Sequence, residues 1–405
     1  MNVSVWIARR YFSSGKEKKF INVLSIIAML GVAVGTAALV IVLSAFNGLE
    51  ALVRKLDQRF DPELKISAAE GKFFVLDTLL AQKIRQAEGV QLITDVIEDN
   101  CLLRYKDAQI VARVKGVAHN FHEHKRIDEA LIAGNARLMQ GNVPVALIGA
   151  GIQQTLSVGI ENRFDAMQLW YPKAKKSVTL NPADAFTKKS IFAGGVFQIS
   201  SQYDDKYIFV PIAFAQELLQ YGNKRTSIEV KVKPDHEITD VKQTLQVLLG
   251  DKFLVQDTDE QHASFMRVMK IEKLFTFCAL LFILLIASFN IFVSLSMLVI
   301  EKKRDISVFY TMGASPQTVK KIFMAEGTII AGIGTAIGLS LGFAVCFAQM
   351  QFGFVSMGMT SAVVEAYPVQ IRWQDFAITG LCVVVFTILA TYGPAMRASK
   401  NNFMQ

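Results

Sequence analysis

The chain has 405 residues, a formal net charge of +8, 52% hydrophobic residues and a mean hydropathy of +0.34. Soluble domains are less apolar than this on average, so the composition excludes an ordinary soluble protein. Residues 48–266 carry 27 Lys and Arg against 28 Asp and Glu, and the rest of the chain carries 16 against 7. The basic excess therefore belongs to the segments that flank apolar runs, and it does not indicate nucleic-acid binding.

Four long runs without a charged residue predict four transmembrane helices. The runs lie between Lys19 and Glu50, Lys273 and Glu301, Glu326 and Glu365, and Asp375 and Arg397. Each run exceeds the roughly 20 residues that a helix needs to cross about 30 Å of hydrocarbon. We expect spans at 21–46, 267–300 (including an extension beyond the membrane), 322–350 and 374–396, with a short loop at 351–373.

The placement of charge sets the expected orientation of these spans. Lys and Arg gather before the first span, between the second and third, and after the fourth, and such residues mark cytoplasmic ends. We therefore expect segments 1–20, 301–321 and 397–405 in the cytoplasm. Residues 47–266 then lie on the opposite side as one large inserted domain.

The inserted domain reads as α/β. Strands are predicted at 62–68, 90–97 and 108–117, with a helix at 75–87; a second set follows at 227–232 (strand), 238–249 (helix) and 253–256 (strand). Between these sets, strands are predicted at 145–148, 166–171 and 208–211, with a helix at 212–219. The order predicts two nested subdomains. The outer one covers 57–118 and 225–260, and the inserted one covers 119–224.

The chain lacks the motifs of an enzyme. It has no G-x-x-x-x-G-K-[ST] phosphate-binding loop and no H-E-x-x-H. His119, His122 and His124 form the only histidine cluster in the sequence, and we interpret them as a solvated loop and not as metal ligands. We therefore expect no catalytic residues, no metal and no cofactor bound by this chain.

The segment after the second span predicts a short amphipathic helix. Charged residues are followed by Ile306, Phe309 and Tyr310 at helical spacing; Gly313 ends this helix, and Ser315 caps the next one with Pro316 in its first turn. Such a helix either lies on an anionic membrane surface or docks on a cytoplasmic partner, and the pattern does not separate the two.

Small residues at four-residue spacing predict close packing between spans. They are Gly334, Gly338 and Gly342 in span three, and Gly31 and Gly35 in span one. Asn290, in the middle of span two, is interpreted as an interhelical hydrogen-bonding residue. Apolar patterns continue both span one and span two into the inserted domain, and this predicts a stiff helical stalk.

Several segments resemble the transmembrane subunits of the lipoprotein-releasing ABC transporter, the LolC/LolE family, within the wider class of MacB-like four-span permeases. The similarity covers essentially the whole chain and is most specific from span two to span three. The residues that carry it are Ala287–Ile291, Ser294, Met297, Glu301–Lys302, Asp305–Ile306, Met312–Ser315, Ile322–Phe323, Gly327, Gly334, Gly338, Tyr367–Val369, Asp375–Phe376, Gly31, Gly35, Val42–Ser44, Asn47–Gly48, Gly195–Phe197, Asp205, Tyr207 and Val210–Pro211.

The resemblance implies a permease in the bacterial inner membrane with its large domain in the periplasm. Two four-span subunits, identical or different, would pair with two copies of a LolD-like ATPase that binds ATP and Mg²⁺. The segment after span two would sit on that ATPase. The residues implied in coupling are Glu301, Lys302, Arg304, Asp305, Ile306, Phe309, Met312, Gly313, Ala314 and Ser315.

The resemblance also implies a substrate route. A lipoprotein's acyl chains would enter between the outer halves of spans one and two and pass to a LolA-like periplasmic chaperone. Apolar residues that suit acyl chains are Leu43, Phe46, Leu49, Phe265, Met266 and Met269, and these would equally suit simple packing. A chaperone-binding hook is expected within 172–206. The alternatives are MacB-like efflux of peptides or toxins and FtsX-like transmission of motion to cell-wall hydrolases.

Overall fold

A computed structural model describes residues 6–8, 19–160, 164–173, 185–357 and 366–400. These residues form two compact units. The first, which we call the bundle, contains the described residues up to Leu52 and those from Arg267 onward. The second, which we call the inserted domain, contains the described residues of Val53–Met266.

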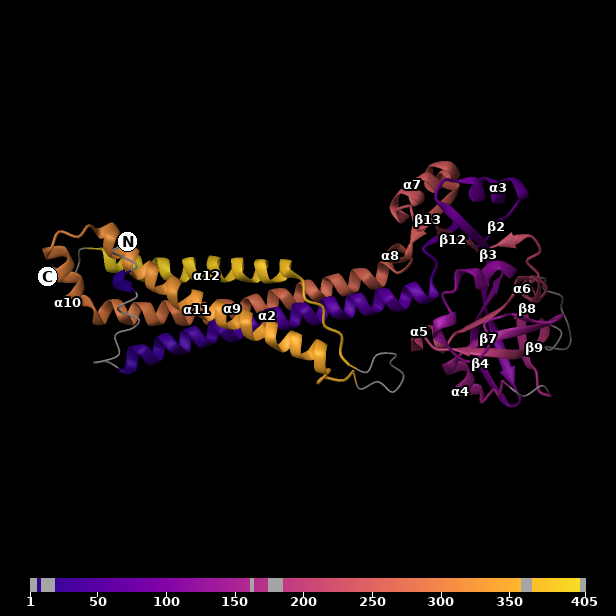
Figure 1. Cartoon of the computed structure of the whole chain (residues 1–405), viewed down its shortest axis with the longest axis horizontal. Coiled ribbons are helices and arrows are strands. Elements are labelled where there is room, and N and C mark those ends of the chain that lie inside the picture. The colour runs from indigo at the N-terminus through magenta and orange to yellow at the C-terminus, as the bar shows by residue number, and fades with distance from the viewer. Residues whose placement is uncertain (1–5, 9–18, 161–163, 174–184, 358–365, 401–405) are drawn as a thin grey trace. The chain divides into compact units, whose positions relative to one another are not determined.

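Long helices build the bundle (Figure 1). They are α2 (Lys19–Phe60), α9 (Ala263–Glu301), α11 (Pro316–Phe352) and α12 (Trp373–Ser399), with the short α10 (Lys303–Thr311) between α9 and α11. Within the described residues, these four long helices are long and apolar enough to cross a membrane. The predicted fold class, four spans with a large inserted α/β domain, is confirmed. Helices α2 and α9 each contain residues of both units, since α2 ends at Phe60 and α9 begins at Ala263.

Glycines bring α11 close to α2. A Cβ atom at Gly334 would lie 2.7 Å from the carbonyl oxygen of Met29, and one at Gly338 would collide with the carbonyl oxygen of Ala33. A Cβ at Gly342 would lie 3.0 Å from the Cβ of Val40. Backbone contact of this kind is possible only where the side chain is a hydrogen atom, and it increases the van der Waals contact that holds helices together in lipid.

Replacement of Gly334 by alanine should weaken the bundle, because the new methyl group overlaps the backbone of α2. Gly332 lies on the same helix, and a Cβ there meets nothing within 4 Å, so Gly332→Ala is the matched control. We expect Gly334→Ala to lower stability by about 1–3 kcal/mol and Gly332→Ala to leave it nearly unchanged. Thermal unfolding of the detergent-solubilised protein measures both, and equal melting temperatures for the two variants would contradict this packing.

A mixed sheet forms the inserted domain. Its strands are β1 (Leu64–Ala68), β3 (Val90–Tyr105), β4 (Ala108–Val117), β5 (Leu131–Gly134), β6 (Met139–Gln140), β7 (Val143–Gly149), β8 (Met167–Pro172), β9 (Phe186–Phe197), β10 (Tyr207–Pro211), β12 (Ser227–Val232) and β13 (Phe253–Asp257). The order is β13-β1-β12-β3-β4-β10-β7-β9-β5, and β6 pairs with β7. Because β8 pairs with both β3 and β9, the strands β3, β4, β10, β7, β9 and β8 close into a ring. A separate pair joins β2 (Phe74–Val75) to β11 (Lys224–Arg225).

Short helices complete the inserted domain. They are α3 (Thr78–Gln86), η1 (His119–His124), η2 (Asp128–Ala130), α4 (Ala150–Leu156), α5 (Ser201–Asp204), α6 (Ile212–Leu219), α7 (Ile238–Leu249), η4 (Gly250–Lys252) and α8 (Thr258–Gln261). Helix α3 begins later than the predicted residue 75, because the carboxylate of Asp77 caps it by accepting a hydrogen bond of 2.6 Å from the Leu80 amide.

Alternation along the strands separates two faces of the sheet. Ile148, Ile208 and Val114 point into a core that α4 and α6 cover, while their neighbours Leu147 and Phe209 point into a second core on the opposite face. Phe60, the last residue of α2, belongs to this second core. The end of α2 is therefore packed on the sheet.

The packing also divides the sheet along its length. Strand β3 is predicted to end at Ile97, but it continues to Tyr105 and contributes to three cores. Its start packs with α3 and α7, Val96 belongs to the core that contains Phe60, and the part from Ile97 on packs with β4 and the strands of the predicted 119–224 subdomain. The change of core thus falls within β3, before the predicted boundary at residues 118 and 119. Paired strands continue without a break across that boundary, since β4 pairs with β10.

Candidate functional site

The last residue of α2 is held by aromatic rings. Phe60 is 1% exposed, and its ring stacks on Tyr203 at a centroid distance of 4.0 Å. Tyr207 and Phe209 complete the contact at 4.5 and 5.6 Å. Aromatic contacts of this kind exclude water and add to the apolar area that is buried. The end of α2 is thereby fixed to α5 and to the adjoining strand β10.

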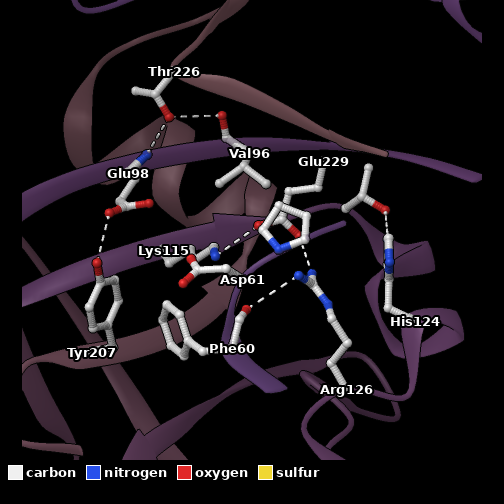
Figure 2. A network of polar contacts seen from close by, with 12 residues as sticks. Phe60, Asp61, Val96, Glu98, Lys115, His124, Arg126, Tyr207, Thr226 and Glu229 are labelled. Carbon is white, nitrogen blue, oxygen red and sulfur yellow. Dashed lines mark hydrogen bonds and ion pairs between the residues drawn. The ribbon is translucent and has the colours of Figure 1, made fainter. Parts of the chain in front are cut away.

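A buried ion network lies beside these rings (Figure 2). The Nζ atom of Lys115 is 2.8 Å from Oε1 of Glu229, and the guanidinium of Arg126 pairs with Oε2 of the same carboxylate. Arg126 also donates to the carbonyl oxygen of Phe60 at 3.3 Å, and Nζ of Lys115 lies 4.7 Å from the centre of the Phe60 ring. Glu229 and Lys115 are 1% and 3% exposed, so the network stands in a low-dielectric interior.

The network is built by strand alternation. Glu229 follows Ile228 on β12 and faces away from the core that Ile228 occupies, and Lys115 stands in the same relation to Val114 on β4. The alternation of each strand taken alone would predict that Glu229 and Lys115 face solvent. The end of α2 covers this face, so both charges are buried.

The network shifts two pKa values. Burial by itself would raise the pKa of Glu229, but Arg126 and Lys115 lower it to about 2. Burial lowers the pKa of His124 to about 4, and the charge of Arg126 acts in the same direction. His124 is 7% exposed, and its Nε2 lies 2.9 Å from Oγ1 of Thr94. The prediction of a solvated histidine loop is therefore wrong for His124, because η1 turns it into the core while His119 and His122 remain exposed.

Protonation of His124 should destabilise the inserted domain. Between pH 6.5 and 4 the unfolded chain binds a proton at His124 that the folded chain does not, so the contribution of His124 to stability falls as the pH is lowered through this window, by on the order of 3 kcal/mol. His124→Gln keeps a hydrogen-bonding group but does not titrate, so it should remove this contribution from the dependence of melting temperature on pH. The exposed His122→Gln is the control and should keep the wild-type slope. A wild-type slope in His124→Gln would contradict the assignment.

A second cluster lies at the end of α2. Tyr203 Oη is 2.8 Å from Oδ1 of Asp57 and 2.9 Å from Oδ2 of Asp61, and His262 Nε2 is 2.6 Å from Oδ2 of Asp61. Burial alone would raise the pKa of Asp61, but the hydrogen bond to His262 and the charge of Lys115 lower it. This cluster connects the end of α2, the start of α9 and α5, and no sequence pattern predicted it because 201 residues separate Asp61 from His262.

A polar junction closes one end of the bundle. Asn47 is fully buried; its Nδ2 donates to Oδ2 of Asp375 at 2.5 Å, and its Oδ1 accepts from Nζ of Lys273 at 2.6 Å. The Gln370 amide donates to the carbonyl oxygen of Ser44 at 2.9 Å. A single side chain thus links α2, α9 and α12. Asn47 and Asp375 are among the residues that carry the family resemblance, and the structure brings them together.

The six residues predicted to bind acyl chains are distributed over both units. In the bundle, Leu43 is 5% exposed and belongs to the common core, while Phe46, Leu49 and Met269 are half-buried. In the inserted domain, Met266 is buried and Phe265 is exposed. Binding of lipid by these residues stays a prediction.

The predicted coupling segment forms the expected helix. Helix α10 is followed by Gly313 with φ +86°, and Ser315 Oγ accepts from the Thr318 amide at 3.3 Å with Pro316 next to it. Ile306 is fully buried in the core of the bundle, and Tyr310 Oη donates to the carbonyl oxygen of Ser399 at 3.1 Å. The helix is therefore attached to the bundle through one face.

The other face of this segment is exposed. Val308 and Met312 are 53% and 78% exposed, and Arg304 and Gly313 are exposed as well. Glu301, Lys302, Phe309 and Ala314 are partly exposed, and Lys302 pairs with the partly exposed Asp305 at 3.3 Å. An apolar surface next to basic side chains suits either a protein partner or a membrane surface.

The remaining predicted packing residues differ in their surroundings. Gly31 and Gly35 face α9, where a Cβ would lie 3.6 Å from Ala287 and 3.5 Å from Leu284. Asn290 is exposed on α9, and among the described residues it makes no hydrogen bond. Its Nδ2 lies next to Gly31 of α2, 4.0 Å from where a Cβ of that residue would stand, and an interhelical hydrogen bond by Asn290 stays a prediction.

Two family models match the chain. The model of the MacB-like periplasmic core domain matches residues 25–248, which is more than half of the chain. The model of the FtsX-like permease C-terminal region matches residues 277–403.

Curated relatives are similar over the full length. The lipoprotein-releasing system transmembrane protein LolC of Buchnera aphidicola subsp. Schizaphis graminum is 24% identical, with 98% of this chain and 97% of the relative covered. LolC of Neisseria meningitidis serogroup B is 24% identical with the same coverage. LolE of Haemophilus influenzae is 23% identical, with 99% of this chain and 98% of the relative covered.

Proposed function

Because the chain belongs to the family that carries the MacB-like periplasmic core domain, we propose that it is a permease subunit of an ABC transporter that releases lipoproteins from the bacterial inner membrane. The observation that supports the lipoprotein substrate is the full-length similarity to LolC and LolE proteins. The chain is a multi-pass membrane protein with a periplasmic domain. In the proposed orientation both termini and α10 lie in the cytoplasm, as the distribution of Lys and Arg favours.

The proposed mechanism uses the long helices as mechanical links. A separate cytoplasmic ATPase would supply ATP hydrolysis and act on α10. Motion of α10 would pass to the bundle through Ile306 and through the hydrogen bond of Tyr310. Helices α2 and α9 each continue into the inserted domain without a break, so their rotation or tilt would reach it directly. The aromatic and ionic contacts of Phe60 would prevent α2 from slipping on the sheet.

The Asn47 junction suits a gate in this mechanism. Lys273 and Asp375 both bond to Asn47, so separation of α2 from α9 breaks a short hydrogen bond of a cationic group. Separation at this end would open a path between spans one and two toward Leu43 and Phe46. A second permease subunit, identical or different, and a periplasmic chaperone of the LolA type would complete the transport route.

Depletion of the protein tests the substrate. We expect outer-membrane lipoproteins to accumulate in the inner membrane of depleted cells, because nothing then extracts them. Separation of the membranes on a density gradient followed by immunoblotting measures the distribution. Normal lipoprotein sorting together with new sensitivity to peptides or toxins would overturn the proposal in favour of MacB-like efflux, and a defect confined to cell separation would favour the FtsX-like alternative.

A charge on the exposed face of α10 tests the ATPase contact. Val308→Glu should reduce copurification of the ATPase by more than about 30-fold, because burying an unpaired carboxylate at an interface costs roughly 2 kcal/mol or more. The matched control is Val247→Glu, which changes a valine of α7 that is 85% exposed and should leave copurification unchanged.

The same pair of variants separates the two interpretations of α10. If Val308→Glu weakens binding of the protein's α10 segment to anionic vesicles but leaves the ATPase attached, α10 is a membrane-surface helix and the proposed contact is wrong.

A further inference from the structure

Three ligand-forming side chains converge in the inserted domain at the end of α2. Asp57, Asp61 and His262 each offer one atom, and these atoms lie within 4.8 Å of one another. Asp57 lies in the last turn of α2, Asp61 directly follows that helix, and His262 lies between α8 and α9. The Asp61 amide donates to the carbonyl oxygen of Asp57 at 2.7 Å, so the two carboxylates stand one helical turn apart on one face.

The position of His262 is determined independently of the aspartates. Thr258 Oγ1 and Gln261 Nε2 both donate to the carbonyl oxygen of Pro62, at 3.3 and 3.1 Å, and hold α8 beside the end of α2. A capping box between Asp257 and Glu260 fixes the start of α8. His262 follows α8 directly, so its ring is directed at Asp61 by the backbone around it.

The hydrogen-bond count shows that Asp57 lacks a charged donor. Asp57 is 4% exposed, and among the described residues the hydroxyl of Tyr203 is its only hydrogen-bond donor. That hydroxyl also reaches Asp61, but a tyrosine carries one hydroxyl hydrogen and donates it to one carboxylate at a time. A buried carboxylate with a shared donor is unstable unless a cation or a proton compensates it. His262 is already bonded to Asp61 and not to Asp57.

We propose that Asp57, Asp61 and His262 form a binding site for a divalent transition-metal cation, with Zn²⁺ as the best fit. Two carboxylate oxygens and one imidazole nitrogen are ligands that zinc accepts, with the fourth position left to water. Ligand atoms around zinc stand about 3.4 Å apart for metal–ligand distances near 2.1 Å. His262 Nε2 and Asp61 Oδ2 are 2.6 Å apart, so these two atoms would move apart when the ion enters, and the three ligand atoms already lie within 4.8 Å of one another.

The bound ion would crosslink the end of α2 to the segment before α9. It would replace the Asp61–His262 hydrogen bond by coordination and neutralise Asp57, and Tyr203 would then donate to a carboxylate oxygen that the metal leaves open. The end of α2 and the start of α9 would become joined through one centre within the inserted domain. Occupancy would thus stiffen the connection of the two long helices that the proposed mechanism uses, although metal binding itself does not depend on that mechanism.

Metal analysis of the full-length protein tests the site. The protein is purified in detergent through a tag without histidine, stripped with EDTA and titrated with Zn²⁺ against a chromogenic chelator. We expect one equivalent of Zn²⁺ per chain, no competition from Mg²⁺, and at least a tenfold loss of affinity in His262→Gln and in Asp61→Asn. His122→Gln changes an exposed histidine of η1 and should bind as the wild type does.

X-ray absorption at the zinc edge of the wild-type protein gives a result that needs no variant. One nitrogen and two or more oxygen neighbours without sulfur are expected. The proposal is overturned if the stripped wild type binds no stoichiometric Zn²⁺, if sulfur ligation is found, or if both variants bind as tightly as the wild type. Absence of binding would assign a proton to Asp57 in place of the metal.

Discussion

Burial of the Glu229 carboxylate constrains much of the inserted domain. A carboxylate removed from water needs positive partners, and here Lys115 and Arg126 provide them from β4 and from the segment after η1. Arg126 has a second task, since it binds the last carbonyl group of α2 at Phe60. The guanidinium of Arg126 therefore both compensates the charge of Glu229 and binds the end of α2. Loss of Arg126 would therefore weaken the compensation of the buried charge and release the end of α2 together.

This arrangement explains why aromatic and ionic contacts occur side by side. The rings of Tyr203, Tyr207 and Phe209 keep water from the end of α2, and a drier site strengthens the interaction of Glu229 with its partners. The end of α2 is held firmly on the sheet because aromatic and ionic contacts are both made by Phe60. A helix that is to transmit motion needs such an anchor, since otherwise a small displacement is lost in side-chain rearrangement.

The bundle follows different rules. Its association does not depend on water exclusion, because lipid is as apolar as the side chains, and many apolar residues such as Phe275 and Leu389 are exposed on its surface. Close backbone contact at Gly334 and Gly338 and the polar junction at Asn47 add to the apolar packing that holds the helices together. Weak general cohesion with a few specific contacts suits helices that must separate and close again.

The sequence by itself determined the four spans, because length without charge and the demands of the lipid act locally along the chain. It also determined helix α10, the caps around Gly313 and Ser315, and most strands of the inserted domain, including β4 and β12. Capping residues and strand alternation are local patterns as well. Only the tertiary structure decided that Glu229 and Lys115 are buried, that β3 contributes to three cores, and that His124 is buried. Each of these depends on which segment covers a given face. Asp61 and His262, or Asn47 and Asp375, meet only after some 200 to 330 intervening residues have folded, and no local pattern records that meeting.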